Sequence, residues 1–215
     1  MSIYNHIMSF LQTIENPIVF ELGVHWAEDT TRIINWCKTK PEYHGFEPDS
    51  RNIAKSKQTI ATNGITMTLN HAAISDKVGT TKLYLSDGIH TKSGNQMTGA
   101  NSIRKPKIVV GKHRWIDFTK EEQNVKTVTI DAYCKEKNIK KIDFIWSDIQ
   151  GCEYDMIVGA KEMLPNIKMM LLEYSNEELY EGQKNLDAII KLLGDDWQVI
   201  EKTPMDVLVK NKKAN

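Results

Sequence analysis

The sequence predicts a single α/β domain built on a mostly parallel sheet, with helices on both faces. Strand-like apolar runs alternate with helical patterns along the chain, which is typical of a parallel sheet covered on both sides. Two apolar runs near the C-terminus are joined by a short turn at Pro204, so those two strands must be antiparallel. With 215 residues, the chain is long enough for one domain with a full core.

The first half of the chain alternates buried strands with amphipathic helices. A leading helix within residues 1–16 has apolar residues at helical spacing and is ended by Pro17. Asp49 or Ser50 is placed to cap the third helix. The expected strands are 18–22, 43–47, 66–74 and a short 82–85, and the expected later helices are about 29–38 and 50–62.

Residues 86–124 lack clear periodicity and mix glycines with polar and basic residues. A stretch of this length inside a compact domain is usually functional or partly disordered. We therefore expect an insertion over the active site, within one domain that spans residues 1–215.

Regular patterns return after this insertion. An apolar stripe from Leu186 to Leu193 predicts a helix, and Gly194 suits its C-terminal cap. The other expected elements are strands at 125–130, 142–149 and 168–174, helices from 131 and over 154–164, and a closing hairpin of 197–203 with 206–210.

Composition narrows the class of partner. The 28 Lys and Arg residues balance the 28 Asp and Glu residues, so no overall field favours nucleic acid or an anionic membrane. Three well-separated cysteines argue against a disulfide framework and favour a reducing compartment. No secretory signal pattern and no long apolar span are found, so we expect a cytoplasmic protein, its oligomeric state left open.

The first chemical signal lies at the ends of the first two strands. In such sheets ligands bind beyond the carboxyl ends of the strands, at the topological switch point. Gly23 permits a sharp turn and a close backbone approach there, and Glu21 is a candidate to fix the turn or to contact a ligand ammonium. Glu47 ends the second strand roughly 20 residues later, where an acid accepts hydrogen bonds from ribose hydroxyls.

A second group of acids follows the central strands. Asp148 ends a buried apolar run, so its carboxylate should have a donor partner, such as a ligand ammonium or an acceptor hydroxyl. Glu173 is expected to face the same opening. For Glu153 and Glu173 the alternative is a structural role, as a helix cap or a partner of nearby lysines. Magnesium held by these three acids is a further alternative, but their spacing does not require it and no metal is predicted.

Five motifs in order resemble the FkbM-type methyltransferases over residues 17–211: 19–23, 45–49, 72–76, 128–131 and 142–153. The resemblance implies a class I, Rossmann-like S-adenosylmethionine-dependent fold with a seven-stranded sheet, and methylation of hydroxyls on small molecules or sugars. By position it implies cofactor binding by Glu21, Gly23 and His25 at the methionine end, Glu47 at the ribose, and the region of Ala73 at the adenine. Asp148 would lie between cofactor and acceptor.

Transfer to a hydroxyl needs a general base within hydrogen-bond reach. Asp148 is the first candidate, with His113 and His25 as alternatives. Asn101 and Ser102 are candidates for binding the acceptor, together with Glu153 and Glu173. The basic segments 104–107 and 112–115 favour an acidic or phosphate-bearing acceptor if they are not merely solvated.

Three other functions remain as alternatives. An NAD-dependent oxidoreductase is disfavoured by the single-glycine turn and the closing hairpin. A non-catalytic cofactor-binding module is suggested by departures from the family pattern at Ser147 and Gln150. Neutral charge and the lack of interleaved basic and aromatic patches count against a nucleic-acid methyltransferase.

Overall fold

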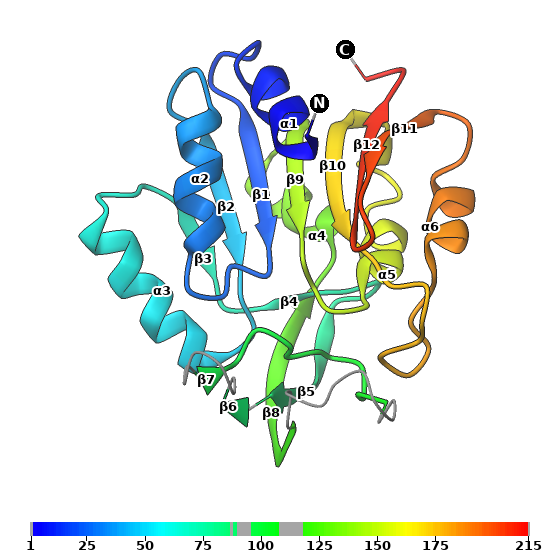
Figure 1. Cartoon of the computed structure of the whole chain (residues 1–215). Helices are drawn as coiled ribbons and strands as arrows, with labels where there is room; N and C mark the ends of the chain where they lie inside the picture. The colour runs from blue at the N-terminus through cyan, green and yellow to red at the C-terminus, as the bar shows by residue number, and fades with distance from the viewer. Residues whose placement is uncertain (1, 87, 90–95, 108–117, 215) are drawn as a thin grey trace.

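The computed structural model describes residues 2–86, 88–89, 96–107 and 118–214. Its main sheet has seven strands in the order β11-β12-β10-β9-β1-β2-β3 (Figure 1). All neighbours from β10 to β3 are parallel, whereas β12 is antiparallel to both β10 and β11. The predicted parallel sheet with a closing antiparallel hairpin is therefore confirmed. The strands are β1 Ile18–Leu22, β2 Glu42–Phe46, β3 Thr68–Asn70, β9 Ile142–Ser147, β10 Ile167–Glu173, β11 Trp197–Lys202 and β12 Asp206–Asn211.

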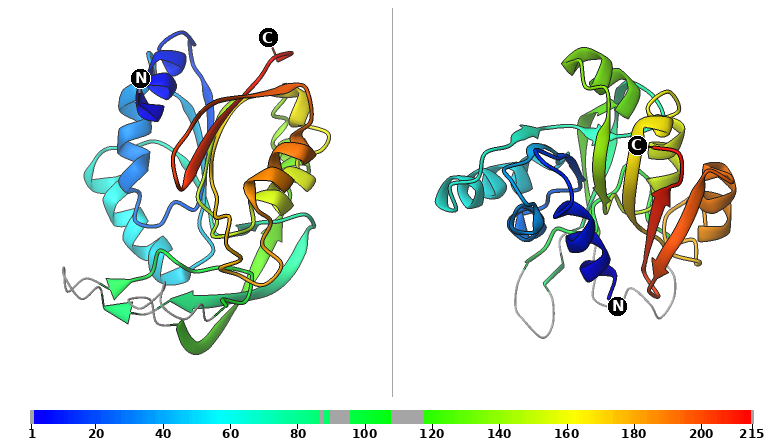
Figure 2. Two further views of the ribbon diagram at one scale, coloured as in Figure 1. Left: turned by 45° about the vertical axis from the view of Figure 1, so that its right-hand side comes forward. Right: turned by 90° about the horizontal axis from the view of Figure 1, so that it is seen from above.

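Six α-helices of the described chain cover the two faces of this sheet (Figures 1 and 2). Asp49 caps the third helix, because its carboxylate accepts the N–H of Arg51 at 2.8 Å. Gly194, at φ 73°, ends the sixth helix where the sequence predicts. The helices are α1 Ile3–Leu11, α2 Glu28–Trp36, α3 Ser50–Thr62, α4 Ile130–Lys137, α5 Glu153–Val158 and α6 Leu186–Leu193.

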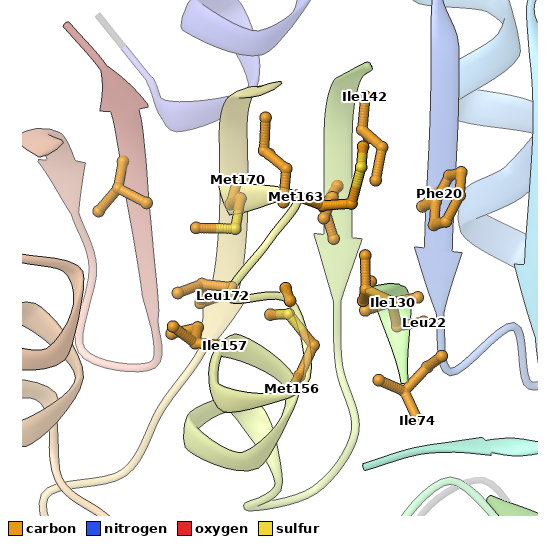
Figure 3. Packing of buried hydrophobic residues seen from close by; sticks show 14 of the residues in the cluster. Phe20, Leu22, Ile74, Ile130, Ile142, Met156, Ile157, Met163, Met170 and Leu172 are labelled. Atoms are coloured by element: carbon orange, nitrogen blue, oxygen red, sulfur yellow. The ribbon is translucent and has the colours of Figure 1, made fainter. Parts of the chain in front are cut away.

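The core consists of two apolar layers, one on each face of the sheet. Val19 of β1 packs with α1 and α2, whereas the next residue, Phe20, packs in the larger layer with α4, α5 and α6. Figure 3 shows the larger layer, in which Met170 and Leu172 of β10 lie near Met156 of α5. Strand β9 is buried at every position, as expected for a central parallel strand.

A second, smaller sheet lies beyond the carboxyl ends of the main strands (Figure 1). It consists of β4 Ala73–Ile74, β8 Phe118–Val128 and β5 Gly79–Ser86, with β8 in the centre. This corrects two expectations: the strand expected over 66–74 is two short strands in different sheets, and part of the expected irregular segment 86–124 is β8. The sequence of β8 is polar at most positions, so it carries no apolar alternation that would reveal a strand. A short pair of β6 Gly88–Ile89 and β7 Gln96–Met97 lies in the same segment.

Two helices are shorter than the sequence suggests. Helix α1 ends at Leu11, and α5 ends at Val158, with Gly159 as its C-cap, rather than near Leu164. A short 3₁₀ turn, Leu164–Asn166, follows. Gly159 lies close to the chain that enters the small sheet: a Cβ atom at this position would be 2.3 Å from the carbonyl oxygen of Ser75. No helix in the described ranges is both long and apolar enough to cross a membrane.

We predict that Gly159→Ala lowers the free energy of unfolding by about 1–3 kcal/mol, because the added methyl group forces apart two packed backbone segments. Gly79→Ala is the matched control, since the nearest atom to a Cβ there is 3.8 Å away and the effect should stay within about 0.5 kcal/mol. Urea unfolding of both variants measures the difference. Equal stabilities would show that the contact at Gly159 is not tight.

Candidate active site

A pocket of about 420 Å³ opens at the carboxyl ends of β1, β2 and β9. The chain crosses here from β3 back to β9, which makes the gap between β1 and β9 the topological switch point. Its lining combines apolar side chains with carboxylates, amides and hydroxyls. The apolar residues include Val24, Phe46, Ala72, Ala73, Ile74, Leu83 and Ile103, and the polar ones include His25, Glu28, Asp29, Glu47, Asn52, Thr98, Asn101, Ser102, Asp148 and Gln150.

Gly23 forms the turn at the end of β1. Its φ of 88° lies in the left-handed region, and a Cβ atom here would be 2.0 Å from the carbonyl oxygen of Asp148. Its N–H donates to the carbonyl of Phe46 at 2.9 Å, which ties the turn to β2. Only glycine fits this position, because both the backbone conformation and the neighbouring carbonyl exclude a side chain.

Glu47 is buried in the pocket wall, 4% exposed, just after β2. One carboxylate oxygen accepts the N–H of His25 and the other accepts the N–H of Asp49, both at 2.8 Å. Burial raises the pKa of this carboxyl to about 7, against the lowering effect of these hydrogen bonds. The Asn52 amide also donates, at 3.4 Å, to the oxygen that accepts from Asp49, so the oxygen bound by His25 keeps the freer lone pair for a hydroxyl of a diol.

His25 follows the turn and links it to Thr98, which directly follows strand β7. Its Nε2 lies 2.9 Å from the hydroxyl of Thr98, and its Nδ1 lies 3.2 Å from both carboxylate oxygens of Glu28. His25 and Ala27 both have left-handed φ angles, 48° and 68°, in a loop where glycine would be less strained. Because both ring nitrogens are engaged, His25 is the weaker candidate for a general base.

Asp148 and Glu173 extend from neighbouring strands and share one donor. The side-chain amide nitrogen of Gln150 donates to Asp148 at 2.6 Å and to Glu173 at 2.7 Å. The amide oxygen of Gln150 accepts the hydroxyl of Tyr180 at 2.8 Å. Asp148 is exposed at the pocket, whereas burial and then the charge of Asp148 raise the pKa of Glu173 well above its ordinary value. One amide thus bridges two carboxyl groups, and the carboxyl group of Asp148 is the one that lines the pocket.

Asn101 and Ser102 line the same pocket, but their polar atoms already bond within the protein. The amide of Asn101 donates to Asp49 at 2.7 Å and accepts the N–H of Ser86 at 2.7 Å. The hydroxyl of Ser102 donates to the carbonyl of Gln150 at 2.8 Å. Both residues therefore shape the pocket, and their role in binding an acceptor stays a prediction.

Besides Glu173, two predicted site residues lie away from this pocket. Glu21, 1% exposed, accepts hydrogen bonds from the hydroxyls of Thr30 at 2.5 Å and Tyr43 at 2.8 Å, and does not line the pocket. Glu153 accepts the N–H of Ile149 at 3.0 Å and lines a second cavity instead. Burial raises the pKa of each carboxyl to about 8. The predicted alternative base, His113, lies outside the described residues.

The second cavity, of about 370 Å³, lies beyond Gln150, which lines both cavities. Glu173, Tyr174, Tyr180 and Met205 are among its other walls. Sequence reasoning missed Tyr180, because it lies in a segment without periodicity. It also missed Asn52 and Thr98, which look like ordinary helix and loop residues. No group of three or more His, Cys, Asp or Glu side chains suited to a metal ion occurs in the described ranges.

The described part of the basic segment is paired with acids. Arg104 contacts Asp155 at 2.6 Å, Lys105 contacts Glu181 at 3.4 Å, and Lys107 contacts Glu178. The two lysine pairs fasten residues 105–107 to residues 178–181, alongside backbone hydrogen bonds from Lys107 to Leu179 and from Glu181 to Lys105, whereas the Arg104 pair reaches α5. Their charges are therefore largely used within the protein.

This strand order, with a pocket at the switch point and an acid after the second strand, defines a class I, Rossmann-like methyltransferase. Residues 15–199 match the methyltransferase FkbM domain. The chain belongs to the FkbM methyltransferase family, which confirms the resemblance seen in its motifs and makes it an enzyme rather than a binding module.

Named relatives agree with this assignment. The chain is 32% identical over 217 residues to the 2-O-methyltransferase NoeI of Sinorhizobium fredii (strain NBRC 101917 / NGR234), covering 99% of this chain and 86% of that protein. The solved FkbM methyltransferase of Methylobacillus flagellatus KT has a TM-score of 0.56 at 14% identity, covering 91% of this chain and 43% of that longer one. SMU.1697c from Streptococcus mutans, solved in complex with SAH, has a TM-score of 0.51 at 10% identity and covers 98% of both chains. At these identities the two structures show the fold alone.

The burial of Glu21 gives a prediction for stability against pH. Its pKa of about 8 in the folded protein exceeds the ordinary value of 4.5, so the folded state holds a proton that the unfolded chain loses. The wild type should therefore lose stability relative to Glu21→Gln as pH rises from about 4.5 to 8, by up to roughly 1.4 kcal/mol per pH unit, and then level off.

Urea unfolding at several pH values between 5.5 and 9 measures this gap. Glu162→Gln, which changes an exposed carboxyl, is the control and should give a gap that does not depend on pH. A pH-independent gap for Glu21→Gln as well would mean that Glu21 is ionised throughout in the folded protein.

Proposed function

We propose that this FkbM methyltransferase binds S-adenosylmethionine in the 420 Å³ pocket and transfers its methyl group to a hydroxyl of a small molecule or sugar. The observation that carries the proposal is Glu47, a buried carboxylate on the pocket wall beside the Gly23 turn. The relative NoeI, named a 2-O-methyltransferase, supports a hydroxyl acceptor.

The donor set of the pocket fits this cofactor. Glu47 offers an acceptor oxygen to the ribose diol, and the apolar side chains of Ala72, Ala73 and Ile74 offer an apolar surface for an adenine ring. The carboxylates of Asp29 and Asp148, at the other end of the pocket, suit the positive methionine portion. His25 and Gly23 border that end, whereas Glu21 supports it from behind through Tyr43 and Thr30.

The chemistry needs alignment and the removal of one proton. The cofactor supplies a sulfonium methyl group, whose carbon–sulfur bond breaks as a carbon–oxygen bond forms to the acceptor. Holding two reactants in line supplies about 7–11 kcal/mol of the barrier reduction. We assign the hydroxyl proton to the carboxylate of Asp148, which lines the pocket and binds the amide of Gln150, a residue that lines both cavities.

We place the acceptor near Gln150 and toward the second cavity. Its walls combine carboxyl groups with Tyr174 and Tyr180, so they suit an uncharged acceptor with several hydroxyls. Glu153 and Glu173 would bind the acceptor from this side, with Asn101 and Ser102 bordering it from the first pocket. An acidic or phosphate-bearing acceptor is less well supported, because Arg104, Lys105 and Lys107 are paired with acids.

We predict that Glu47→Gln weakens binding of S-adenosylhomocysteine by about 10- to 100-fold, because hydrogen bonds to a charged acceptor contribute about 1.5–3 kcal/mol. Titration calorimetry measures the change. Glu42→Gln, on an exposed side chain of the same strand, should bind as the wild type does. Binding of NAD in place of S-adenosylmethionine would contradict the proposed cofactor.

We predict that Asp148→Asn lowers kcat by about 10²- to 10⁴-fold through loss of the base. The affinity for S-adenosylhomocysteine should fall by less than about 5-fold, because Asp148 is exposed and an exposed ion pair contributes under about 1 kcal/mol. Transfer of labelled methyl groups from S-adenosylmethionine to a panel of methyl pyranosides is the assay, and Asp195→Asn on the surface is the control. Full turnover by Asp148→Asn would rule out this base.

A further inference from the structure

Gln150 holds two carboxyl groups with one amide. It donates one N–H toward Asp148 and one toward Glu173, at 2.6 and 2.7 Å, and its oxygen accepts the hydroxyl of Tyr180 at 2.8 Å. A primary amide has two N–H donors and one carbonyl acceptor, so all three functions of this side chain are used. An acid in the same place would have no N–H to offer when ionised and would repel both neighbours.

The backbone of Gln150 is fixed as firmly as its side chain. The residue adopts a left-handed φ of 51° and is followed by Gly151 at 90°. Its carbonyl accepts the hydroxyl of Ser102 at 2.8 Å, and the preceding N–H of Ile149 is held by Glu153 at 3.0 Å. Because the backbone of Gln150 is fixed, its side chain loses little further conformational entropy when it binds two carboxyl groups at once.

Tyr180 connects this amide to two paired segments, residues 99–107 and 178–183. Its hydroxyl lies within hydrogen-bond distance of the Ala100 carbonyl, at 2.9 Å, as well as of Gln150. The pairing of Pro106 with Tyr180 and the ion pairs of Arg104 and Lys107 keep the tyrosine in place. The orientation of the amide, and of the carboxyl groups it binds, is thus set by a segment far away in the sequence.

The charges around Glu173 support the same arrangement. Asp148, Glu153 and Asp206 all face this carboxyl, and burial together with these acids raises its pKa well above the ordinary value. This shift favours the protonated form of Glu173, whose carbonyl oxygen still accepts from the Gln150 amide. Asp148, exposed at the pocket, lies at the other side of the same amide.

From this geometry we infer that Gln150 is a positioning residue: its amide, oriented by Tyr180, fixes the carboxylate of Asp148 toward the acceptor. The inference rests on the proposed function for the role of Asp148 as base. The inference adds a residue that does not itself react. It also assigns Glu173 the role of holding the Gln150 amide that positions Asp148.

The first test is independent of any acceptor. Scalar couplings that report χ1 of Asp148 are measured by NMR in the wild type, in Gln150→Ala and in Tyr180→Phe. We expect one rotamer in the wild type and averaged couplings in Gln150→Ala, with a partial change in Tyr180→Phe, which removes only a hydroxyl group. Gln58→Ala, on the exposed side of α3, is the matched control and should leave the couplings unchanged. Unchanged couplings in Gln150→Ala would overturn the inference.

The second test is a double-mutant cycle in single-turnover transfer to methyl pyranosides. Gln150→Ala should lower the rate about 10- to 100-fold in the wild type, because small misplacements of a reacting group are costly, and by less than about 2-fold in Asp148→Asn. Affinity for S-adenosylhomocysteine should stay near the wild-type value, which a general structural defect of the pocket would change.

The outcomes separate the two proposals. An equal loss of rate in both backgrounds would show that Gln150 does not act through Asp148, and the inference would fail. If Asp148→Asn turns over normally while the couplings respond to Gln150→Ala, the assignment of the base fails but the positioning contact stands. If Gln150→Ala does not fold, Tyr180→Phe decides alone, through the same couplings and the same cycle.

Discussion

The site depends on the close approach of two backbones at the switch point of the sheet. Gly23 lies so near the carbonyl of Asp148 that a Cβ atom would be 2.0 Å from the oxygen. The N–H of Asp148 donates to Leu22 at 2.9 Å, so the pairing of β1 with β9 continues one residue beyond the strands. The turn that borders the cofactor pocket and the carboxylate that faces the acceptor are therefore fixed relative to each other by the main chain.

Three buried carboxyl groups show how the same chemistry serves different ends. The pKa values of Glu21, Glu47 and Glu153 are all raised by burial, and each group is compensated by hydroxyl or backbone N–H donors. Glu21 joins α2 to β1 and β2, and Glu153 secures the loop between β9 and α5. Only Glu47 borders the large pocket. Glu21 and Glu153 stabilise the strands and loops that surround Glu47. Ionisation of these two buried carboxyl groups would cost free energy.

The sequence predicts the parts of this site that depend on the position of a residue along a strand. Gly23, Glu47 and Asp148 each follow a buried strand, so their convergence at one edge is predictable. Which face Glu21 occupies is not, because β1 is apolar on both sides and alternation gives no signal. Tyr180 reaches Gln150 through tertiary pairing of two aperiodic segments, and strand β8 is too polar to reveal itself. These features depend on contacts that no local pattern records.

The strained residues of the chain point to the same region. In the described ranges, five residues other than glycine have positive φ angles; two are asparagines, which tolerate this conformation, and the others are His25, Ala27 and Gln150. All three lie in the two loops that leave β1 and β9 at the pocket. Left-handed backbone costs these residues about 1–2 kcal/mol each, and glycine would avoid that cost. At positions 25 and 150 glycine would also remove the ring that contacts Thr98 and the amide that contacts Asp148. The backbone strain at these positions is therefore balanced by side-chain contacts that build the site.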